Sequence, residues 1–154
     1  MKIGLIYFSH TGHTAIVAEQ LTNILEKAGH QVISTRLETC KPLQMSATHA
    51  AIKEAPTVES FDAVIVGTPV HGSRISAPVL TWLERIPSLS EKKVSFFLTH
   101  FFPCKWGAVQ TIEALDKICS EKGAVVLGSA DVTWLSLSRK KQIHTAVSQL
   151  HKLL

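Results

Sequence analysis

Cysteine and long hydrophobic runs are both scarce in this chain. Its 154 residues include three cysteines, Cys40, Cys104 and Cys119, and no C-x-x-C pair. This pattern argues against a disulfide framework and against a structural zinc site. No apolar run approaches the ~20 residues that cross a bilayer, and the first residues lead into a predicted strand without a cleavable signal pattern. We therefore expect a cytoplasmic protein with free thiols, outside the membrane.

The two commonest nucleotide-binding loops are also missing. Neither G-x-x-x-x-G-K-[ST] nor G-x-G-x-x-G occurs, which argues against nucleoside triphosphates and dinucleotides as tightly bound ligands. The net charge is +4, but the basic residues are scattered, with one dense cluster at Arg139, Lys140 and Lys141. One such triplet is typical of a solvated helix start, so we expect no nucleic-acid partner.

Short apolar segments alternate with helical patterns along the whole chain. Strand-like segments occupy residues 2–8, 31–37, 63–67, 94–98 and 124–128, and helical periodicity follows at 15–28, 79–86, 108–119 and 143–154. Continuously apolar strands in a β-α alternation are typical of a parallel sheet covered by helices on both faces. Residues 43–55 are ambiguous, and we predict a weak helix there, ended by Pro56. The sequence thus predicts one doubly wound α/β domain over residues 1–154.

The first predicted strand is followed by an anion-binding pattern. A strand, a turn of small hydroxylated residues and a helix start place unpaired backbone N–H groups around one point, where a phosphate fits. Helix capping alone explains only one or two of these hydroxyls. The six residues of the pattern are Ser9, His10, Thr11, Gly12, His13 and Thr14.

Two further loops follow the third and fourth predicted strands. In an open α/β sheet, a ligand lies beyond the carboxyl ends of the strands. Residues 67–78 contain two prolines and two glycines, and Pro78 begins a helix. Residues 99–107 contain three aromatic side chains, which a solvated loop does not normally expose. A flat aromatic ligand would give these rings a partner.

Together these loops resemble the FMN-binding loops of the flavodoxin-like family. The pattern Ser9-x-Thr11-Gly12-x-Thr14 is similar to the family's phosphate loop, and residues 67–72 are similar to its second flavin loop. The resemblance implies a five-stranded sheet in the order 2-1-3-4-5 and bound FMN. It also implies that residues 9–14 hold the phosphate. The flavin ring would then lie between two groups of residues: Thr68, Pro69, Val70, His71 and Gly72 on one side, and Thr99, His100, Phe101 and Trp106 on the other.

Charge separates this chain from the acidic electron carriers of that family. Residues 68–78 and 99–107 contain no Asp or Glu, but they contain Arg74 and Lys105. A cation ~7 Å from a reduced flavin, at an effective dielectric of ~20, stabilises the negative charge by about 2 kcal/mol. This corresponds to a shift on the order of 100 mV in a one-electron couple. We therefore predict a second reduction potential less negative than that of acidic carriers.

Three functions fit this pattern. The first is a flavodoxin-like redox protein that carries electrons through non-covalent FMN to a partner protein or a quinone-like acceptor. The second is an NAD(P)H-dependent flavin reductase of quinones, with His71 or His100 as a proton donor. The third is a module that has lost FMN and binds a partner. A phosphoacceptor receiver and a low-molecular-weight phosphatase are excluded, because their aspartates and their cysteine-led loop are absent.

Several residues also have ordinary structural interpretations. The histidines of the three loops lack carboxylates or cysteines at ligand spacing, so we predict no metal site. A protonated His10 or His13 beside the phosphate is the preferred interpretation. Cys119 lies on the apolar face of its helix and is predicted to be in the core, and Cys104 is interpreted as an incidental thiol. Packing roles are predicted for two tryptophans away from the loops, Trp82 and Trp134.

Overall fold

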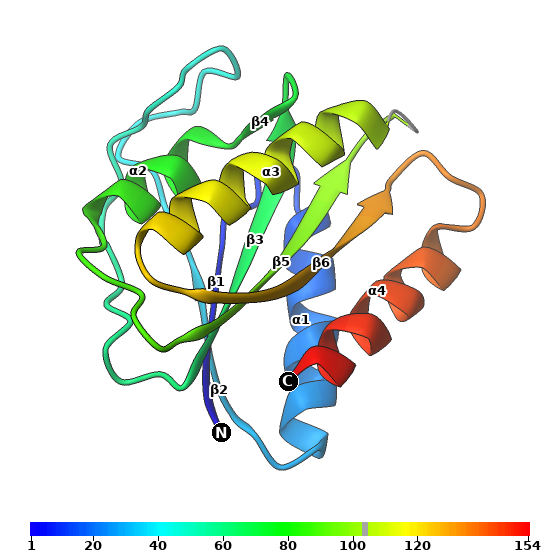
Figure 1. Ribbon diagram of the computed structural model, residues 1–154. Coiled ribbons are helices and arrows are strands. Elements are labelled where there is room, and N and C mark those ends of the chain that lie inside the picture. The colour runs from blue at the N-terminus through cyan, green and yellow to red at the C-terminus, as the bar shows by residue number, and fades with distance from the viewer. Residues whose placement is uncertain (103–104) are drawn as a thin grey trace.

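A central sheet with helices on both faces forms the protein (Figure 1). We describe it from a computed structural model that covers residues 1–102 and 105–154, with the backbone alone at residues 105 and 106. In this part of the chain, five parallel strands run in the order β2-β1-β3-β5-β6, and a short β4 pairs with β3. The strands are β1 (Lys2–Tyr7), β2 (Gln31–Arg36), β3 (Ala63–His71), β4 (Arg74–Ile75), β5 (Lys93–His100) and β6 (Val125–Thr133).

Two helices cover each face of the sheet. One face carries α1 (His13–Lys27) and α4 (Arg139–Leu153), and the other carries α2 (Ala77–Arg85) and α3 (Lys105–Glu121) (Figure 1). Side chains of successive strand residues point to opposite faces of a sheet. In β3, Ala63 and Ile65 therefore pack with α1 and α4, while Val64 and Val66 pack with α2 and α3. The predicted α/β architecture, with helices on both faces, is confirmed.

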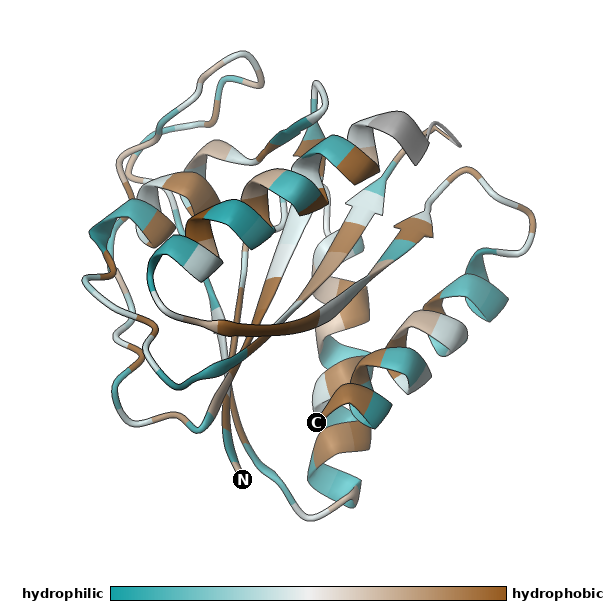
Figure 2. Cartoon of the chain, in the orientation of Figure 1, coloured by the Kyte–Doolittle hydropathy of each residue, from teal (hydrophilic) through white to brown (hydrophobic). Residues whose placement is uncertain are grey.

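The central strands are buried on both sides. Figure 2 shows hydrophobic residues along these strands, whereas the helices carry both hydrophobic and hydrophilic residues. Burying one Val, Leu or Ile side chain contributes about 1.5–3 kcal/mol, so the two cores supply the main stabilisation of the sheet. The edge strand β2 is different, because Ile33 on it is 40% exposed. The prediction that every strand is covered on both faces is therefore wrong for β2.

The sheet has six strands, one more than the five predicted, and the additional strand is β4. The segment after residue 67 was expected to be a loop, but β3 continues to His71 and folds back into β4, with Val70 opposite Ile75 and His71 opposite Arg74. The turn residues Gly72 and Ser73 have φ values of +56° and +62°. Positive φ at both central residues is typical of a two-residue hairpin turn, which the Gly-Ser pair makes possible.

Strand β6, the fifth of the predicted strands, also runs past its predicted end. It was expected to stop at Gly128 but continues to Thr133. Its pairing with β5 shifts by one residue, because Val94 lies opposite Val126 and Ser95 lies opposite Gly128. The φ of +148° at Gly128 accommodates this bulge, so the glycine marks an irregularity inside the strand and not its end.

The weak helix predicted at residues 43–55 is absent from the structure of this described segment. The chain there is irregular, and an isolated bridge joins Thr39 to Ile52. Most of its apolar residues are alanines, so a helix would have had little surface to bury. The segment is instead fixed by Ile52, which is 5% exposed, and by the indole Nε1 of Trp82, which donates to the Pro56 carbonyl at 2.9 Å. The packing role predicted for Trp82 is confirmed.

Two other features bear on the sequence predictions. Cys119 is fully buried among the core residues of α3, as predicted, and burial raises the pKa of its thiol to about 12. Cys40 is an exposed free thiol, while Cys104 lies outside the described residues. None of the helices in the described part of the chain combines the length and hydrophobicity that a membrane-spanning helix requires.

Candidate functional site

The three predicted loops meet at one cavity beyond the carboxyl ends of β1, β3 and β5. Its volume is about 280 Å³. Segments from four parts of the chain contribute to its wall, although they are far apart in the sequence. The lining residues are His10, Thr11, His13 and Thr14 after β1, Met45 from the irregular segment, Pro69, Val70 and His71 from β3, and Thr99, His100 and Phe101 from the end of β5.

The loop between β1 and α1 has the geometry of an anion cradle. Gly12, the residue before α1, has a φ of +93°, a conformation that favours glycine. In the described part of the chain, no acceptor contacts the backbone N–H groups of residues 10–14. These free donors lie at the positive end of the dipole of α1, where an anionic group is favoured.

Most hydroxyls in these loops hold the backbone in place. The Ser9 hydroxyl accepts a hydrogen bond from the Ala15 N–H at 3.2 Å, which satisfies a backbone donor in the first turn of α1. The Thr14 and Thr99 hydroxyls share a buried hydrogen bond of 2.8 Å, which ties the first loop to β5. Thr68 pairs with the Ser76 hydroxyl at 2.8 Å and accepts from its N–H at 3.1 Å. Of the four predicted loop hydroxyls on residues 9–14 and 68, only that of Thr11 is on an exposed residue.

Arg36 supports the first loop through a hydrogen bond, and sequence analysis did not predict this role. It ends β2, and its Nη2 donates to the Ser9 carbonyl at 2.6 Å. A guanidinium that satisfies this carbonyl fixes the turn and adds positive charge near the free amides. Parallel pairing places the ends of β1 and β2 side by side, so their register is the signal that would have located it.

His71 and His10 form an aromatic group with Phe8. The ring centroids of His71 lie 6.5 Å from Phe8 and 6.2 Å from His10, both edge to face. His71 is 7% exposed, and burial lowers its pKa to about 4, with Coulombic repulsion from His10 and Arg74 as smaller causes. Its imidazole is therefore neutral at pH 7. A neutral ring can donate one hydrogen bond but is a poor acid.

His13 stacks on Trp134, which the sequence interpretation had placed away from the loops. The two ring centroids are 4.0 Å apart and nearly parallel. The guanidinium of Arg139 lies 4.8 Å from the Trp134 ring, and its Nη1 donates to the Trp134 carbonyl at 3.2 Å. Burial, and secondarily the charge of Arg139, lower the pKa of His13. Without an anion in the cradle, this ring is therefore more readily neutral than a free histidine.

Trp134 thus has two roles. It is 8% exposed and packs in the core with α1 and α4, as predicted, but its ring also stacks on His13 of the first loop. Sequence analysis missed this second role, because it predicts that β6 ends at Gly128, six residues before Trp134. Its backbone N–H donates to the His100 carbonyl at 2.7 Å, which joins the segment after β6 to the third loop.

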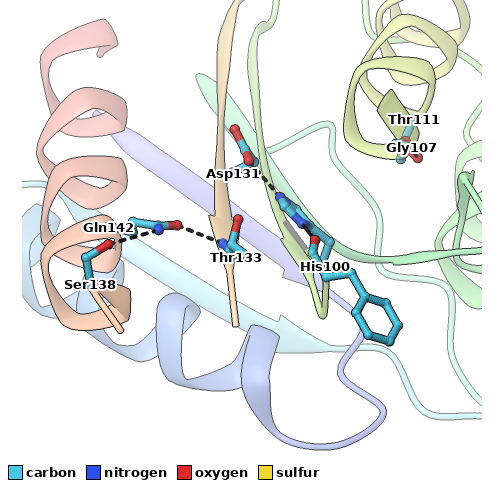
Figure 3. Close-up of polar contacts among 8 residues, drawn as sticks. His100, Gly107, Thr111, Asp131, Thr133, Ser138 and Gln142 are labelled. Atoms are coloured by element: carbon cyan, nitrogen blue, oxygen red, sulfur yellow. Dashed lines mark hydrogen bonds and ion pairs between the residues drawn. The ribbon is translucent and has the colours of Figure 1, made fainter. Parts of the chain in front are cut away.

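His100 is held by two acceptors (Figure 3). Its Nε2 lies 2.7 Å from the Asp131 carboxylate on β6, and its Nδ1 lies 2.6 Å from the Phe102 carbonyl. The carboxylate and carbonyl oxygens are hydrogen-bond acceptors, so these two contacts orient the imidazole ring. The pair fixes the third loop to β6. Beside it, the Gln142 amide oxygen accepts from the Thr133 N–H at 2.9 Å and anchors α4.

The predicted site residues fall into three groups. Ten line the cavity: His10, Thr11, His13, Thr14, Pro69, Val70, His71, Thr99, His100 and Phe101. Ser9, Gly12, Thr68 and Gly72 shape the surrounding backbone instead. The Trp106 side chain lies outside the described residues. Among the side chains that are described, no three histidines, cysteines or carboxylates gather in a way that could hold a metal ion.

Comparisons with known proteins agree with this geometry. The chain is 27% identical over 135 residues to a flavodoxin from Megasphaera elsdenii, covering 84% of this chain and 85% of that protein. It is 27% identical over 95 residues to an NAD(P)H dehydrogenase (quinone) from Gluconacetobacter diazotrophicus, covering 57% and 48% of the two chains. The chain thus spans about half the length of this quinone dehydrogenase.

A solved structure and a family model complete the comparison. The fold matches that of a flavoprotein from Lactobacillus acidophilus in complex with FMN, with a TM-score of 0.66, 14% identity and coverage of 94% and 97%. The family model described as NADPH-dependent FMN reductase matches residues 1–135. The chain therefore belongs to the NADPH-dependent FMN reductase family and is a flavodoxin-like redox protein with FMN as its cofactor.

Proposed function

We propose that residues 10–14 hold the FMN phosphate with their free backbone N–H groups. The observation that carries this proposal is the set of unpartnered amides at the start of α1, in a loop whose residues His10, Thr11, His13 and Thr14 line the cavity. The bond between Thr14 and Thr99 and the bond from Arg36 to the Ser9 carbonyl keep this loop in place. His13 lies beside the amides, and a bound phosphate would favour its protonated form.

The flavin ring is proposed to occupy the cavity between β3 and the third loop. Pro69, Val70 and His71 would contact one part of the ring, and Thr99 and Phe101 another, because all five line the cavity. Trp106 remains a prediction as a further contact. When bound, FMN supplies the redox chemistry of the protein, while the chain binds, orients and shields it.

The two histidines have different proposed roles. His71 is neutral at pH 7 and in position to donate one hydrogen bond to a ligand in the cavity. His100 is a positioning residue, since its two ring nitrogens are engaged by Asp131 and Phe102. Neither arrangement favours the role of proton donor to a quinone.

Electron exchange with NAD(P)H and a quinone is the second candidate function. Among the described residues, no Asp or Glu lines the cavity, and Arg74 lies next to it on β4. This charge balance favours the binding of an anionic electron donor and stabilises the negative charge of a reduced flavin. Arg74 is exposed, so solvent screens it and its effect on the potential is smaller than the value for an unscreened cation.

Binding and reduction can be tested separately. The apoprotein is titrated with FMN and with riboflavin, which lacks the phosphate, while flavin fluorescence is recorded. We expect FMN to bind at least tenfold more tightly than riboflavin, and equal affinities would contradict the proposed phosphate site. The holoprotein is then mixed anaerobically with NADPH. Bleaching of the flavin band without a separate reductase supports the reductase function, and its absence, with normal reduction by dithionite, supports the carrier function.

A further inference from the structure

Exposed apolar side chains form a rim beside the cavity. Phe101 and Phe102 are 51% and 66% exposed, and Leu135 and Leu137 are 54% and 110% exposed. The two loops are joined, because the Leu135 N–H donates to the Phe101 carbonyl at 3.2 Å. Single exposed apolar residues are common, but a group of four on two linked loops is typical of an interaction site. We call these four residues the apolar rim.

Basic side chains lie next to the apolar rim. Arg139, Lys140 and Lys141 begin α4, two residues after Leu137, and all three are exposed. The hydrogen bond from Arg139 to the Trp134 carbonyl holds this helix start against the same loop. In the described part of the chain, the ion pairs join Lys53 to Glu38, His49 to Glu84 and His100 to Asp131, so this triplet has no acidic partner there.

The segments that build this side of the molecule lack Asp and Glu residues that could neutralise the basic triplet. Residues 132–154 contain no Asp or Glu, and neither do residues 1–18, 63–83 and 92–112. These segments include every loop that lines the cavity except the one with Met45. Asp131, which lies just outside them, is paired with His100. The positive charge is therefore available to a partner and is not neutralised by the protein itself.

The position of the rim indicates what kind of partner it suits. Phe101 belongs both to the rim and to the cavity wall, so a molecule seated on the rim covers the mouth of the flavin site. A second copy of this chain would bring two basic triplets together in a symmetric contact, which like charges oppose. An acidic protein with an apolar spot matches both the charge and the exposed leucines.

We propose that the apolar rim and the basic triplet together form the docking surface for a small acidic electron-transfer protein. The proposal rests on the redox function of bound FMN. The chemical class of partner that we take is a reduced iron–sulfur protein: its cluster would lose one electron, and bound FMN would gain that electron. Charge attraction steers the encounter, and Leu135 and Leu137 lose water on contact.

The test uses the holoprotein and a reduced plant-type [2Fe–2S] ferredoxin as an acidic probe. The anaerobic rate of flavin reduction is measured by stopped-flow absorbance between low and high salt. The test variant is Lys140→Glu/Lys141→Glu, and Leu137→Ser tests the apolar contact. The matched control is Lys27→Glu/Lys152→Glu, with the same charge change in the last turns of α1 and α4.

The expected results separate the proposal from the cofactor assignment. At low salt, we expect the double charge reversal to slow reduction at least tenfold and Leu137→Ser to slow it several-fold, while the control stays within twofold of wild type. Added salt should slow the wild type but not the charge-reversed variant. Equal rates for test and control variants would overturn the proposal.

A second measurement does not depend on the flavin. Binding of oxidised ferredoxin to each variant is measured by biolayer interferometry, and the same variants are incubated with vesicles that contain phosphatidylserine. Loss of ferredoxin binding in the test variant alone supports the docking surface, even if a preparation lacks FMN. Binding to the vesicles with no binding to ferredoxin would overturn it and assign the rim to an anionic lipid surface.

Discussion

Gly12 and Gly29 have almost the same backbone conformation, with φ values of +93° and +88°, and a Cβ at either position would meet no atom within 4 Å. Alanine at either position is strained by about 1 kcal/mol because of this conformation. Only Gly12 shapes the free amides before α1. We expect Gly12→Ala to weaken FMN binding at least tenfold and Gly29→Ala to leave it unchanged, although both lower the free energy of unfolding similarly.

Urea unfolding and FMN fluorescence titration of the two variants check this prediction. Gly29→Ala is the matched control, since it carries the same strain at the end of α1. If Gly12→Ala bound FMN as tightly as Gly29→Ala does, the conformation of the first loop would not matter to the phosphate.

His71 makes stability depend on pH. Its pKa is lowered from 6.5 to about 4 in the folded protein, mainly by burial. Below pH 6.5 the unfolded chain binds a proton that the folded chain does not bind until near pH 4. The free energy of unfolding therefore falls as the pH drops through this window, by about 2 kcal/mol between pH 7 and pH 5. His71→Gln should remove this share of the loss.

Urea unfolding of the apoprotein at the two pH values measures the effect. His13 and His30, whose pKa values are also lowered, act in the same direction, so the comparison is the difference between wild type and variant. Substitution of the exposed His144 by Gln serves as the control. A His71→Gln protein with the full pH dependence of wild type would show that His71 is not the titrating group.

At the scale of elements, β3 and β5 approach closely at Gly67. A Cβ on Gly67 would lie 2.1 Å from the ring of Phe97, which is fully buried against α1 and α4. Gly67→Ala forces the ring to move within a packed core, and we expect it to lower the free energy of unfolding by about 1–3 kcal/mol. Adding Phe97→Leu should make room and recover part of this loss.

The check is urea unfolding of both single variants and the double variant. The sum of the single effects should exceed the effect of the double variant, because the two residues share one contact. Strict additivity would mean that the close approach of β3 and β5 at Gly67 is relieved in some other way.

Element types followed well from the sequence, while element ends did not. Continuous apolar runs predicted the central parallel strands, because these strands are buried between helices, whereas the edge strand β2 is partly exposed. Glycines were wrong guides to strand ends at two places, because β3 continues past Gly67 to His71 and β6 continues past Gly128, which lies in a bulge. The segment at residues 43–55 has no periodic pattern, and its path is set by contacts with distant residues such as Trp82.

The site was predictable where neighbouring residues build it. The first loop shows its cradle in six consecutive residues, and the structure places free amides there. Arg36, Met45 and Trp134 were missed, since each reaches the site from a strand end or a loop that lies far away in the sequence. Only the strand order and the twist of the sheet bring them together.

At the scale of the whole molecule, the distribution of charge predicts the redox potential. No acidic side chain lines the cavity, and the protein carries a net charge of +4. A negatively charged reduced flavin is therefore less strongly opposed than in an acidic protein. We expect the potential of the couple that forms the fully reduced flavin to be tens of millivolts or more above about −400 mV, the level of plant-type ferredoxins.

Anaerobic potentiometric titration of the holoprotein measures this value. Added salt should lower the potential, because it screens the surface charges. A potential at or below that of an acidic ferredoxin, independent of salt, would contradict the argument from charge.

The cavity is assembled from four stretches that span positions 10 to 101, so it exists only while β1, β3 and β5 are held together. Because only the folded protein can bind FMN, the supply of riboflavin, from which FMN is made, affects how long the protein survives. FMN at a hundredfold excess over its Kd adds about 2.7 kcal/mol against unfolding. A cell starved of riboflavin should lose this protein to its proteases faster than a well-fed cell does.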